Sequence, residues 1–179
     1  ARVGVLRATP RDLVALGTVA DLVALTGENR ILVRPGLARV SATRRSGLCQ
    51  WDEVSGVGGT VDVYETGYLL APRLNAAGRM ESAFAALDLC LARDHDQAVG
   101  LAATLDAHNR DRQTIERRIA EEVIEAVSAS FDPVRDYVIV HGNPDWHIGV
   151  VGIVASRVMR TFHRPTLIVG GEGGEWRGS

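Results

Sequence analysis

The stretch HGNPDWHIGVVGIVASRVMRTFHRPTLIV, residues 141–169, decides the fold class of this chain. Within it, apolar residues recur every four positions over 147–162, which predicts a helix that buries one face. Apolar and β-branched residues at 136–141 and at 166–169 predict a short buried strand on either side of that helix. Two strands separated by one helix indicate a parallel pair with a right-handed crossover. We therefore expect an α/β fold, with a third strand over 175–179.

A long helix is expected immediately before this unit, over residues 96–130. Its apolar residues fall on one stripe, and glutamates and arginines fill the opposite face. A helix of about 35 residues would be about 50 Å long, so we interpret it as a connector between two lobes. Asp94-His95-Asp96 at its start looks like a metal cluster. We interpret it as a helix cap instead, because a metal site needs further ligands from elsewhere.

The part of the chain before the long helix is expected to mix helices with loops. Residues 11–25 predict a helix, and Pro35 is expected to open a second, short one. Glycines and polar residues over 41–67 favour a loop, with a strand possible over 60–65. Residues 75–80 are expected to form a turn. From Ser82 onward the pattern is again helical, with apolar residues at helical spacing: Phe84, Leu87 and Leu91.

Composition bounds the class of protein. The chain has 179 residues, 46% of them hydrophobic, and a net charge of −2, which suits one core or two small lobes and requires any nucleic-acid site to be a local basic patch. Cys49 and Cys90 lie far apart, so we expect free thiols in a reducing cytosol and no structural zinc. With no apolar run long enough for a bilayer, a cytoplasmic protein is expected. Both ends, at Ala1 and Ser179, look cut.

The first candidate site residue is Asp21, at the end of the segment ALGTVAD (15–21). Small and apolar residues precede it and are expected to be packed. A carboxylate among packed residues must be paired, hydrogen-bonded or bound to a metal, because burying it bare is costly. The alternative is an ordinary aspartate on a helix surface, and composition alone favours that alternative.

The second candidate segment is APRLNAAGR (71–79), in which Arg73 and Arg79 flank a run of small residues. A guanidinium fits phosphate oxygens, and small residues let backbone N–H groups approach the same anion. The alternative is a pair of solvated arginines on either side of a turn.

The third candidate segment is HGNPDWHIG (141–149), which leads from a strand into a helix. Free N–H groups and the helix dipole at such a helix start favour an anion, with His147 and Gly149 at its mouth. The alternative is a helix start capped by Asp145, with Trp146 serving as packing.

In this order and at these spacings, the segments resemble RecJ-type single-strand-specific exonucleases of the DHH phosphoesterase superfamily. The matching stretches are LGTVADLVAL (16–25), ENRILVRPGL (28–37), APRLNAAGRMESA (71–83), LDAHNRDRQTIE (105–116) and residues 141–169. The resemblance implies the C-terminal part of a DHH catalytic domain over 1–82, a helical connector over 83–131 and the first part of a DHH-associated domain over 132–179.

The same resemblance assigns site residues. Asp21 matches an aspartate that helps hold a two-metal centre of Mn²⁺ or Mg²⁺. The expected contacts to the DNA backbone or the 5′ phosphate are Arg73, Asn75, Gly78, Arg79, His147 and Gly149. Arg177 and Ser179 match the start of a strand motif that binds the terminal phosphate.

The function implied is metal-dependent 5′→3′ exonuclease hydrolysis of single-stranded DNA, in DNA repair and recombination. The implied partners are single-stranded DNA with a 5′ end, a helicase and a single-strand-binding protein, with no membrane involved. The chain contains no DHH sequence and no DxD near its start, so alone it is expected to be inactive. Two alternatives stay open. One is a DHH-family phosphodiesterase for oligonucleotides or cyclic dinucleotides, and the other is a non-catalytic nucleic-acid-binding module.

Overall fold

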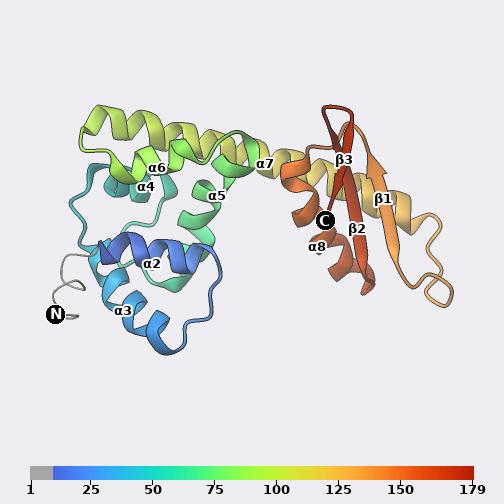
Figure 1. The fold of residues 1–179 in the computed structure, drawn as a ribbon, viewed down its shortest axis with the longest axis horizontal. Helices are drawn as coiled ribbons and strands as arrows, with labels where there is room; N and C mark the ends of the chain where they lie inside the picture. Colours follow the sequence, from blue (N-terminus) through green and yellow to red (C-terminus); the bar gives the residue numbers. More distant parts are fainter. Residues whose placement is uncertain (1–9) are drawn as a thin grey trace. The chain divides into compact units, whose positions relative to one another are not determined.

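The computed structural model describes residues 10–179, which divide into two compact units that meet within one helix, between Asn109 and Arg110. The first unit is built from helices, and the second contains a small sheet (Figure 1). The expected cut at Ala1 lies outside the described residues. No helix among residues 10–179 is long and apolar enough to cross a membrane.

The first unit consists of helices that follow one another closely along the chain. They are α2 (Arg11–Ala20), α3 (Gly27–Ser41), α4 (Ser46–Ser55), the π-helix η1 (Glu65–Leu70), α5 (Ala71–Met80), α6 (Phe84–Leu91) and the first part of α7 (His95–Ser128). The π-helix continues into α5 without a break, so the two form one helical segment from Glu65 to Met80.

Apolar side chains from α2, α4, η1, α6 and α7 form the main core of this unit. Its largest fully buried members are Trp51, Leu70, Leu89 and Leu105. Burying one such side chain contributes about 2 kcal/mol, so this cluster holds the helices together. A smaller apolar cluster joins α2 to α3, where Gly36 lies against Arg11 O and the Ala15 side chain. Any larger residue at position 36 would push the two helices apart.

Four local predictions for this unit are wrong. The loop favoured over 41–67 contains the helix α4, which buries Leu48 and Trp51. Pro35 lies inside α3 and does not open a helix, because Val33 and Leu37 continue one buried face on both sides of it. Residues 60–65 form no strand. The Val61 N–H donates to Ser41 Oγ at 2.9 Å, so a side chain satisfies this backbone in place of a neighbouring strand. Residues 75–80 are helical, since α5 runs through Met80 with its small residues packed inward.

The helix expected from Ser82 is confirmed as α6, but its apolar stripe is not a core face. Phe84, Leu87 and Leu91 are 73%, 50% and 56% exposed, and Leu89 is the buried residue. The long helix is confirmed as α7. Asp94 caps it, with Oδ1 accepting from the Gln97 N–H at 2.9 Å, as the capping interpretation of Asp94-His95-Asp96 predicts.

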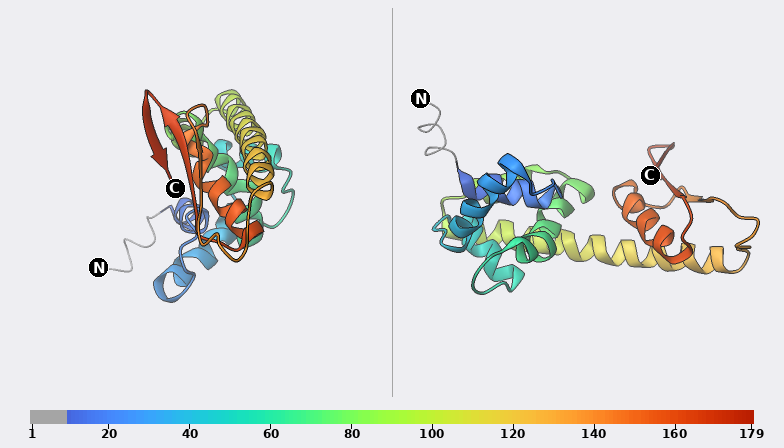
Figure 2. Two further views of the ribbon diagram at one scale, coloured as in Figure 1. Left: turned by 90° about the vertical axis from the view of Figure 1, so that its right-hand side faces the viewer. Right: turned by 90° about the horizontal axis from the view of Figure 1, so that it is seen from below.

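The second unit contains the end of α7 and the predicted strand–helix–strand pattern: β1 (Ile139–Asn143), α8 (Ile148–Phe162), β2 (Thr166–Glu172) and β3 (Glu175–Gly178). β1 and β2 pair in parallel, and β2 and β3 pair antiparallel (Figure 2). The valine stripe of α8 is fully buried and belongs to one cluster with Ile119 and Val123 of α7. The α/β fold class and the helix over 147–162 are thereby confirmed, and the first strand lies slightly later than predicted.

Candidate functional site

Three of the predicted site residues line one cavity in the first unit. Asp21, Asn75 and Arg79 surround a space of about 360 Å³, together with Ala20 and Leu22. The cavity lies where the C-terminal end of α2 meets the exposed side of α5. The Asn75 side-chain amide donates to Ala20 O at 3.3 Å and so ties the two helices together at this point. Residues that are more than fifty positions apart in the sequence therefore share one site.

Asp21 has a position that favours a cation. It is the C-cap of α2, and its N–H donates to Gly17 O at 3.1 Å. A helix C-terminus carries partial negative charge, so a carboxylate there is unfavourable for the helix and attractive to a cation. The residues before it are packed as expected, with Ala15, Leu16 and Val19 buried, but the Asp21 side chain itself is exposed, as the alternative of an aspartate on the helix surface predicted. Its electrostatic surroundings, and not burial, make it a candidate ligand.

Leu22, beside Asp21, has a strained backbone. Its φ is +55°, which is rare for a residue other than glycine, and its side chain is 87% exposed. Apolar burial therefore does not explain the residue. The Leu22 N–H donates to Val19 O at 3.1 Å and the Val23 N–H donates to Thr18 O at 3.2 Å, so this left-handed residue ends α2 in a Schellman motif, and the φ itself reflects the helix end. The sequence carried no signal for Leu22 or Ala20, because neither has a reactive group.

Arg73 and Gly78 belong to the same helix as Asn75 but do not line the cavity. The Arg73 guanidinium forms an ion pair with Asp106 of α7, with Nε 2.8 Å from Oδ1, and donates to Leu69 O at 2.6 Å. A side-chain carbon added at Gly78 would lie 3.6 Å from Ala83 Cβ, an ordinary contact. Packing alone thus does not require glycine at position 78.

In the second unit, His147 caps α8. Its Nδ1 accepts from the Gly149 N–H at 3.0 Å. The alternative of a cap by Asp145 is wrong, since His147 is the N-cap residue of α8. The Asp145 N–H donates to Asn143 Oδ1 at 2.9 Å. Trp146 is buried and donates from Nε1 to Glu122 at 3.2 Å, as the packing interpretation predicts. The Gly149 N–H at the start of the helix therefore already donates a hydrogen bond to the His147 imidazole.

Arg177 and Ser179 lie at the end of the same unit. Arg177 is exposed on β3 and forms ion pairs with Glu172 at 3.5 Å and with Glu175 at 3.8 Å. The Ser179 backbone pairs with Ile168 through two hydrogen bonds of 3.0 Å. A side-chain carbon added at Gly152 of α8 would lie 3.0 Å from Ser179 Oγ, so this glycine makes room for the serine hydroxyl. Ser179 thus lies against the first half of α8.

The described residues do not by themselves form a metal site. No three His, Cys, Asp or Glu side chains among residues 10–179 are grouped so that they could hold an ion. Asp94-His95-Asp96 is not grouped with a further such side chain among these residues either. Asp21 supplies one carboxylate, whereas a two-metal centre requires several. Any metal bound at Asp21 would need ligands from outside the described residues.

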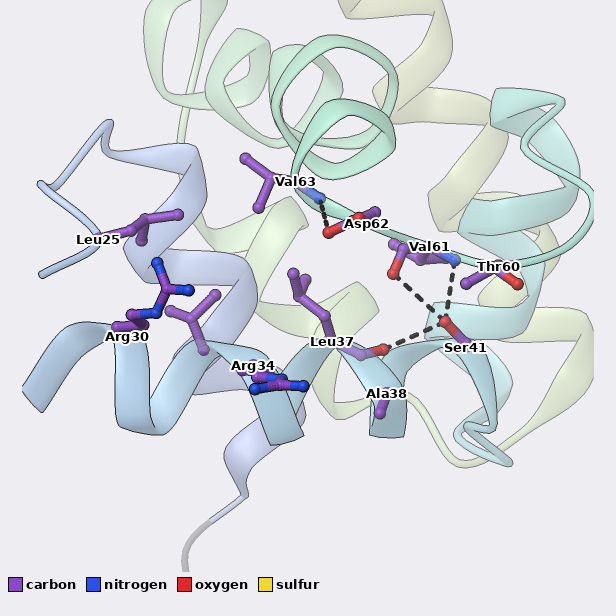
Figure 3. Close-up of a pocket in the computed structure, with 11 residues that line it drawn as sticks. Leu25, Arg30, Arg34, Leu37, Ala38, Ser41, Thr60, Val61, Asp62 and Val63 are labelled. Atoms are coloured by element: carbon purple, nitrogen blue, oxygen red, sulfur yellow. Dashed lines mark hydrogen bonds between the residues drawn. The ribbon is translucent and has the colours of Figure 1, made fainter.

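A second cavity, of about 320 Å³, lies between α3 and residues 60–63 (Figure 3). Its floor is apolar and includes Leu37 and Val61, and the guanidinium groups of Arg30 and Arg34 lie at its edge. Ser41 closes one end, where its hydroxyl bonds to the backbone of Val61. No predicted site residue lines this cavity, and no motif in the sequence pointed to it.

No protein-family model matches the chain. Curated relatives do match it. The single-stranded-DNA-specific exonuclease RecJ of Bacillus subtilis is 41% identical over 160 residues, 89% of this chain and 20% of that protein. The RecJ of Dickeya dadantii is 43% identical over 161 residues, 87% of this chain and 28% of that protein. The chain therefore spans between a fifth and somewhat more than a quarter of the length of these relatives.

Solved structures match in the same way. The chain is similar to RecJ from Thermus thermophilus in complex with Mg²⁺, with a TM-score of 0.80 and 38% identity over 89% of this chain and 25% of that one. It is also similar to an exonuclease RecJ bound to manganese, with a TM-score of 0.78, 39% identity and coverage of 40% of that chain. By sequence and by fold, almost the whole chain is similar to one part of the RecJ exonucleases.

Proposed function

We propose that this chain is part of a metal-dependent 5′→3′ exonuclease that hydrolyses the phosphodiester bonds of single-stranded DNA. One observation carries the proposal. Asp21, Asn75 and Arg79 line one cavity in a chain that is 39–43% identical to RecJ exonucleases along almost its whole length. A carboxylate, an amide and a guanidinium around one open space suit a phosphodiester bound beside a cation.

Each of the three residues has a separate task in this proposal. Asp21 contributes one ligand to a centre of Mn²⁺ or Mg²⁺, which when bound supplies positive charge and an activated water. Arg79 binds phosphate oxygens through its planar guanidinium. Asn75, fixed by its hydrogen bond to Ala20 O, holds α5 against the end of α2 and so sets the separation between Asp21 and Arg79. The residues that would hold the metal and the phosphate thereby line one cavity.

Arg73 has a positioning task here. Its guanidinium is held by Asp106 and Leu69, so it anchors α5 to α7 and keeps Asn75 and Arg79 in place. The remaining residues stay proposed contacts to the DNA backbone or the terminal phosphate: Gly78, His147, Gly149, Arg177 and Ser179. The domain scheme of 1–82, 83–131 and 132–179 also stays a proposal.

In the cell, we place the intact enzyme in the cytoplasm, where it degrades single strands from a 5′ end during DNA repair and recombination. We propose two partners for such a substrate. One is a helicase that unwinds duplex DNA, and the other is a single-strand-binding protein. The chain alone is proposed to bind single-stranded DNA and not to cut it, because Asp21 is a single metal ligand.

The test is a titration of the chain against a fluorescent, 5′-phosphorylated single strand, followed by anisotropy in Mn²⁺. Arg79→Ala is expected to weaken binding about tenfold, since it removes one charge-assisted contact to phosphate. Arg39→Ala is the matched control, because Arg39 is also exposed and lies near the end of α3. Equal affinity of Arg79→Ala and the control would contradict the proposal.

A digestion with the same oligonucleotide tests the metal assignment. No product is expected from the chain alone. If the chain cuts the strand and Asp21→Ala still cuts, the metal centre lies elsewhere and the role given to Asp21 is wrong. Calorimetric titration with Mn²⁺ gives a second readout, because Asp21→Asn should weaken whatever binding the chain itself shows.

A further inference from the structure

Two exposed tyrosines lie side by side near the start of the π-helix that precedes α5: Tyr64 is its N-cap residue and Tyr68 lies within it. Tyr64 and Tyr68 are 62% and 72% exposed, and their ring centroids lie 5.0 Å apart with a tilt of 31°. Thr66 and Leu70 of the same segment are almost completely buried, so the tyrosines occupy the opposite, outer side. Two adjacent aromatic rings left in water form an apolar surface that a ligand can cover.

This aromatic pair lies next to the cavity of Asp21, Asn75 and Arg79. The π-helix runs directly into α5, and Tyr68 precedes Asn75 by seven residues, about two turns or about 10 Å along the axis. Asn75, Arg79 and Tyr68 are all exposed on this one helical segment. The distance corresponds to about three stacked nucleotides.

The end of α2 borders the same helical segment. A side-chain carbon added at Gly67 would lie 3.9 Å from Val19 Cγ1, two residues before Asp21. The π-helix that carries Tyr68 therefore packs against the last turn of α2, just before Asp21. A strand held at Asn75 and Arg79 would meet the rings if it continued along the helix.

The charges near the tyrosines favour bases over phosphates as the bound groups. Asp62 and Glu65 are the charged residues next to Tyr64, and the Glu65 carboxylate accepts from the Asp62 N–H at 2.9 Å. Two carboxylates repel a phosphate backbone. A flat, uncharged ring avoids this repulsion and matches the size and shape of an aromatic pair.

We infer that Tyr64 and Tyr68 form a platform on which bases of the single strand stack, beyond the phosphate held at Asn75 and Arg79. The inference rests on the proposed function and adds a contact that distinguishes strands with bases from a bare sugar–phosphate chain. Stacking on an aromatic side chain accepts every base, so the platform would add affinity without sequence preference. It also would require unpaired bases, which suits a single-strand substrate.

The test compares the affinity of the chain for a fluorescent 15-nucleotide oligo(dT) and for an abasic strand of the same length. The wild-type chain is expected to bind oligo(dT) at least about tenfold more tightly. Tyr68→Ala and Tyr64→Ala should each reduce this ratio, and the double variant should bring it close to one. Their affinity for the abasic strand should not change. Tyr68→Phe, which keeps the ring, should behave like the wild type.

Tyr137→Ala is the matched control, because Tyr137 is 78% exposed and lies in the other unit. If the tyrosine variants keep the wild-type ratio while Arg79→Ala weakens binding of both strands, the platform is refuted and the proposed function stands. If Arg79→Ala has no effect or oligo(dT) is not bound, the proposed function fails and the platform with it. Unchanged circular dichroism of the variants excludes unfolding as the cause of any loss.

Discussion

The Arg73 guanidinium and the Asp106 carboxylate form an ion pair between α5 and α7, with 2.8 Å between Nε and Oδ1. The two side chains are only 18% and 14% exposed, and Arg73 also donates to Leu69 O. The pair joins the two helices through residues that are 33 positions apart in the sequence. A residue that looks like a phosphate ligand in the sequence thus holds the helix that carries Asn75 and Arg79.

Removing the acidic partner should therefore destabilise the chain. Asp106→Ala leaves the Arg73 charge half-buried without its carboxylate and is expected to cost about 3 kcal/mol of unfolding free energy. Urea unfolding followed by circular dichroism measures this. Arg79→Ala, on the exposed side of the same helix, should change stability by less than about 0.5 kcal/mol. Equal stabilities of the two variants would mean that the ion pair does not anchor α5.

Leu22 offers a test of backbone strain beside Asp21. Leu22→Gly should raise the unfolding free energy by about 1 kcal/mol, because glycine adopts a φ of +55° without steric cost. Little apolar burial is lost, since the leucine side chain is 87% exposed. Thermal unfolding of the wild type, Leu22→Gly and Leu22→Ala gives the measurement, and Ala should show no gain. A lower melting temperature for the glycine variant would contradict the strain.

Asp52 of α4 should make stability depend on pH. Burial raises the pKa of this carboxyl above its ordinary value of 3.8, and its buried Oδ1 has no hydrogen-bond partner among the described residues. The folded chain therefore holds a proton more tightly than the unfolded chain does. The contribution of this protonated carboxyl to the free energy of unfolding is fully present below pH 3.8, and it is lost as the pH rises through the higher pKa of the folded state.

The variant Asp52→Asn carries no such charge. Its stability relative to the wild type should increase as the pH rises from about 4 to 7, where the wild type must bury an ionised carboxylate. Chemical unfolding at a series of pH values gives the comparison. If the unfolding free energy of Asp52→Asn relative to the wild type instead decreases over this pH range, the ionised Asp52 carboxylate is stabilised by its surroundings.

The two cysteines should react at different rates. Burial raises the pKa of the Cys90 thiol above its ordinary value of 9.0, with a further increase from Asp12 that Arg45 opposes. Little thiolate is then present at pH 8, and the half-buried sulfur is less accessible. Cys49 is exposed. A thiol reagent should label one cysteine rapidly and one slowly, and Cys49→Ser should abolish the rapid phase. Loss of the slow phase in that variant would reverse the assignment.

The second unit was predictable from sequence because its signals are local and agree. Valines at intervals of four over 147–162, with β-branched strands on both sides, specify a helix between two strands without reference to distant residues. The first unit was less predictable. Asn75-Ala-Ala-Gly78 has the local composition of a turn, yet it is helical because Ala76 and Ala77 pack into the interior. Pro35 stays inside a helix for a similar reason, since the buried face of α3 continues past it.

The candidate site was predictable only in part. Residue types and spacing singled out the segments that contain Asp21 and Arg79, but only the family resemblance assigned roles to Asp21, Asn75 and Arg79. The shared cavity follows from the packing of α2 on α5, which no local pattern specifies. The partner of Arg73 and the strained φ of Leu22 depend on contacts made only in the folded chain. The capping nitrogen of His147 was missed because an aspartate beside it is the commoner cap.

The π-helix has a consequence for how this segment tolerates insertions and deletions. Hydrogen bonds in a π-helix span one residue more than those of an α-helix, so Glu65–Leu70 accommodates length that an α-helix would not. Loss of one residue there would let the segment close into a regular α-helix and would rotate everything before it by about 100° relative to α5. The direction of the Tyr64 side chain relative to Arg79 would change by the same angle. The length of this π-helix therefore sets how the tyrosine platform and Arg79, the two parts of the proposed DNA surface, are oriented relative to each other.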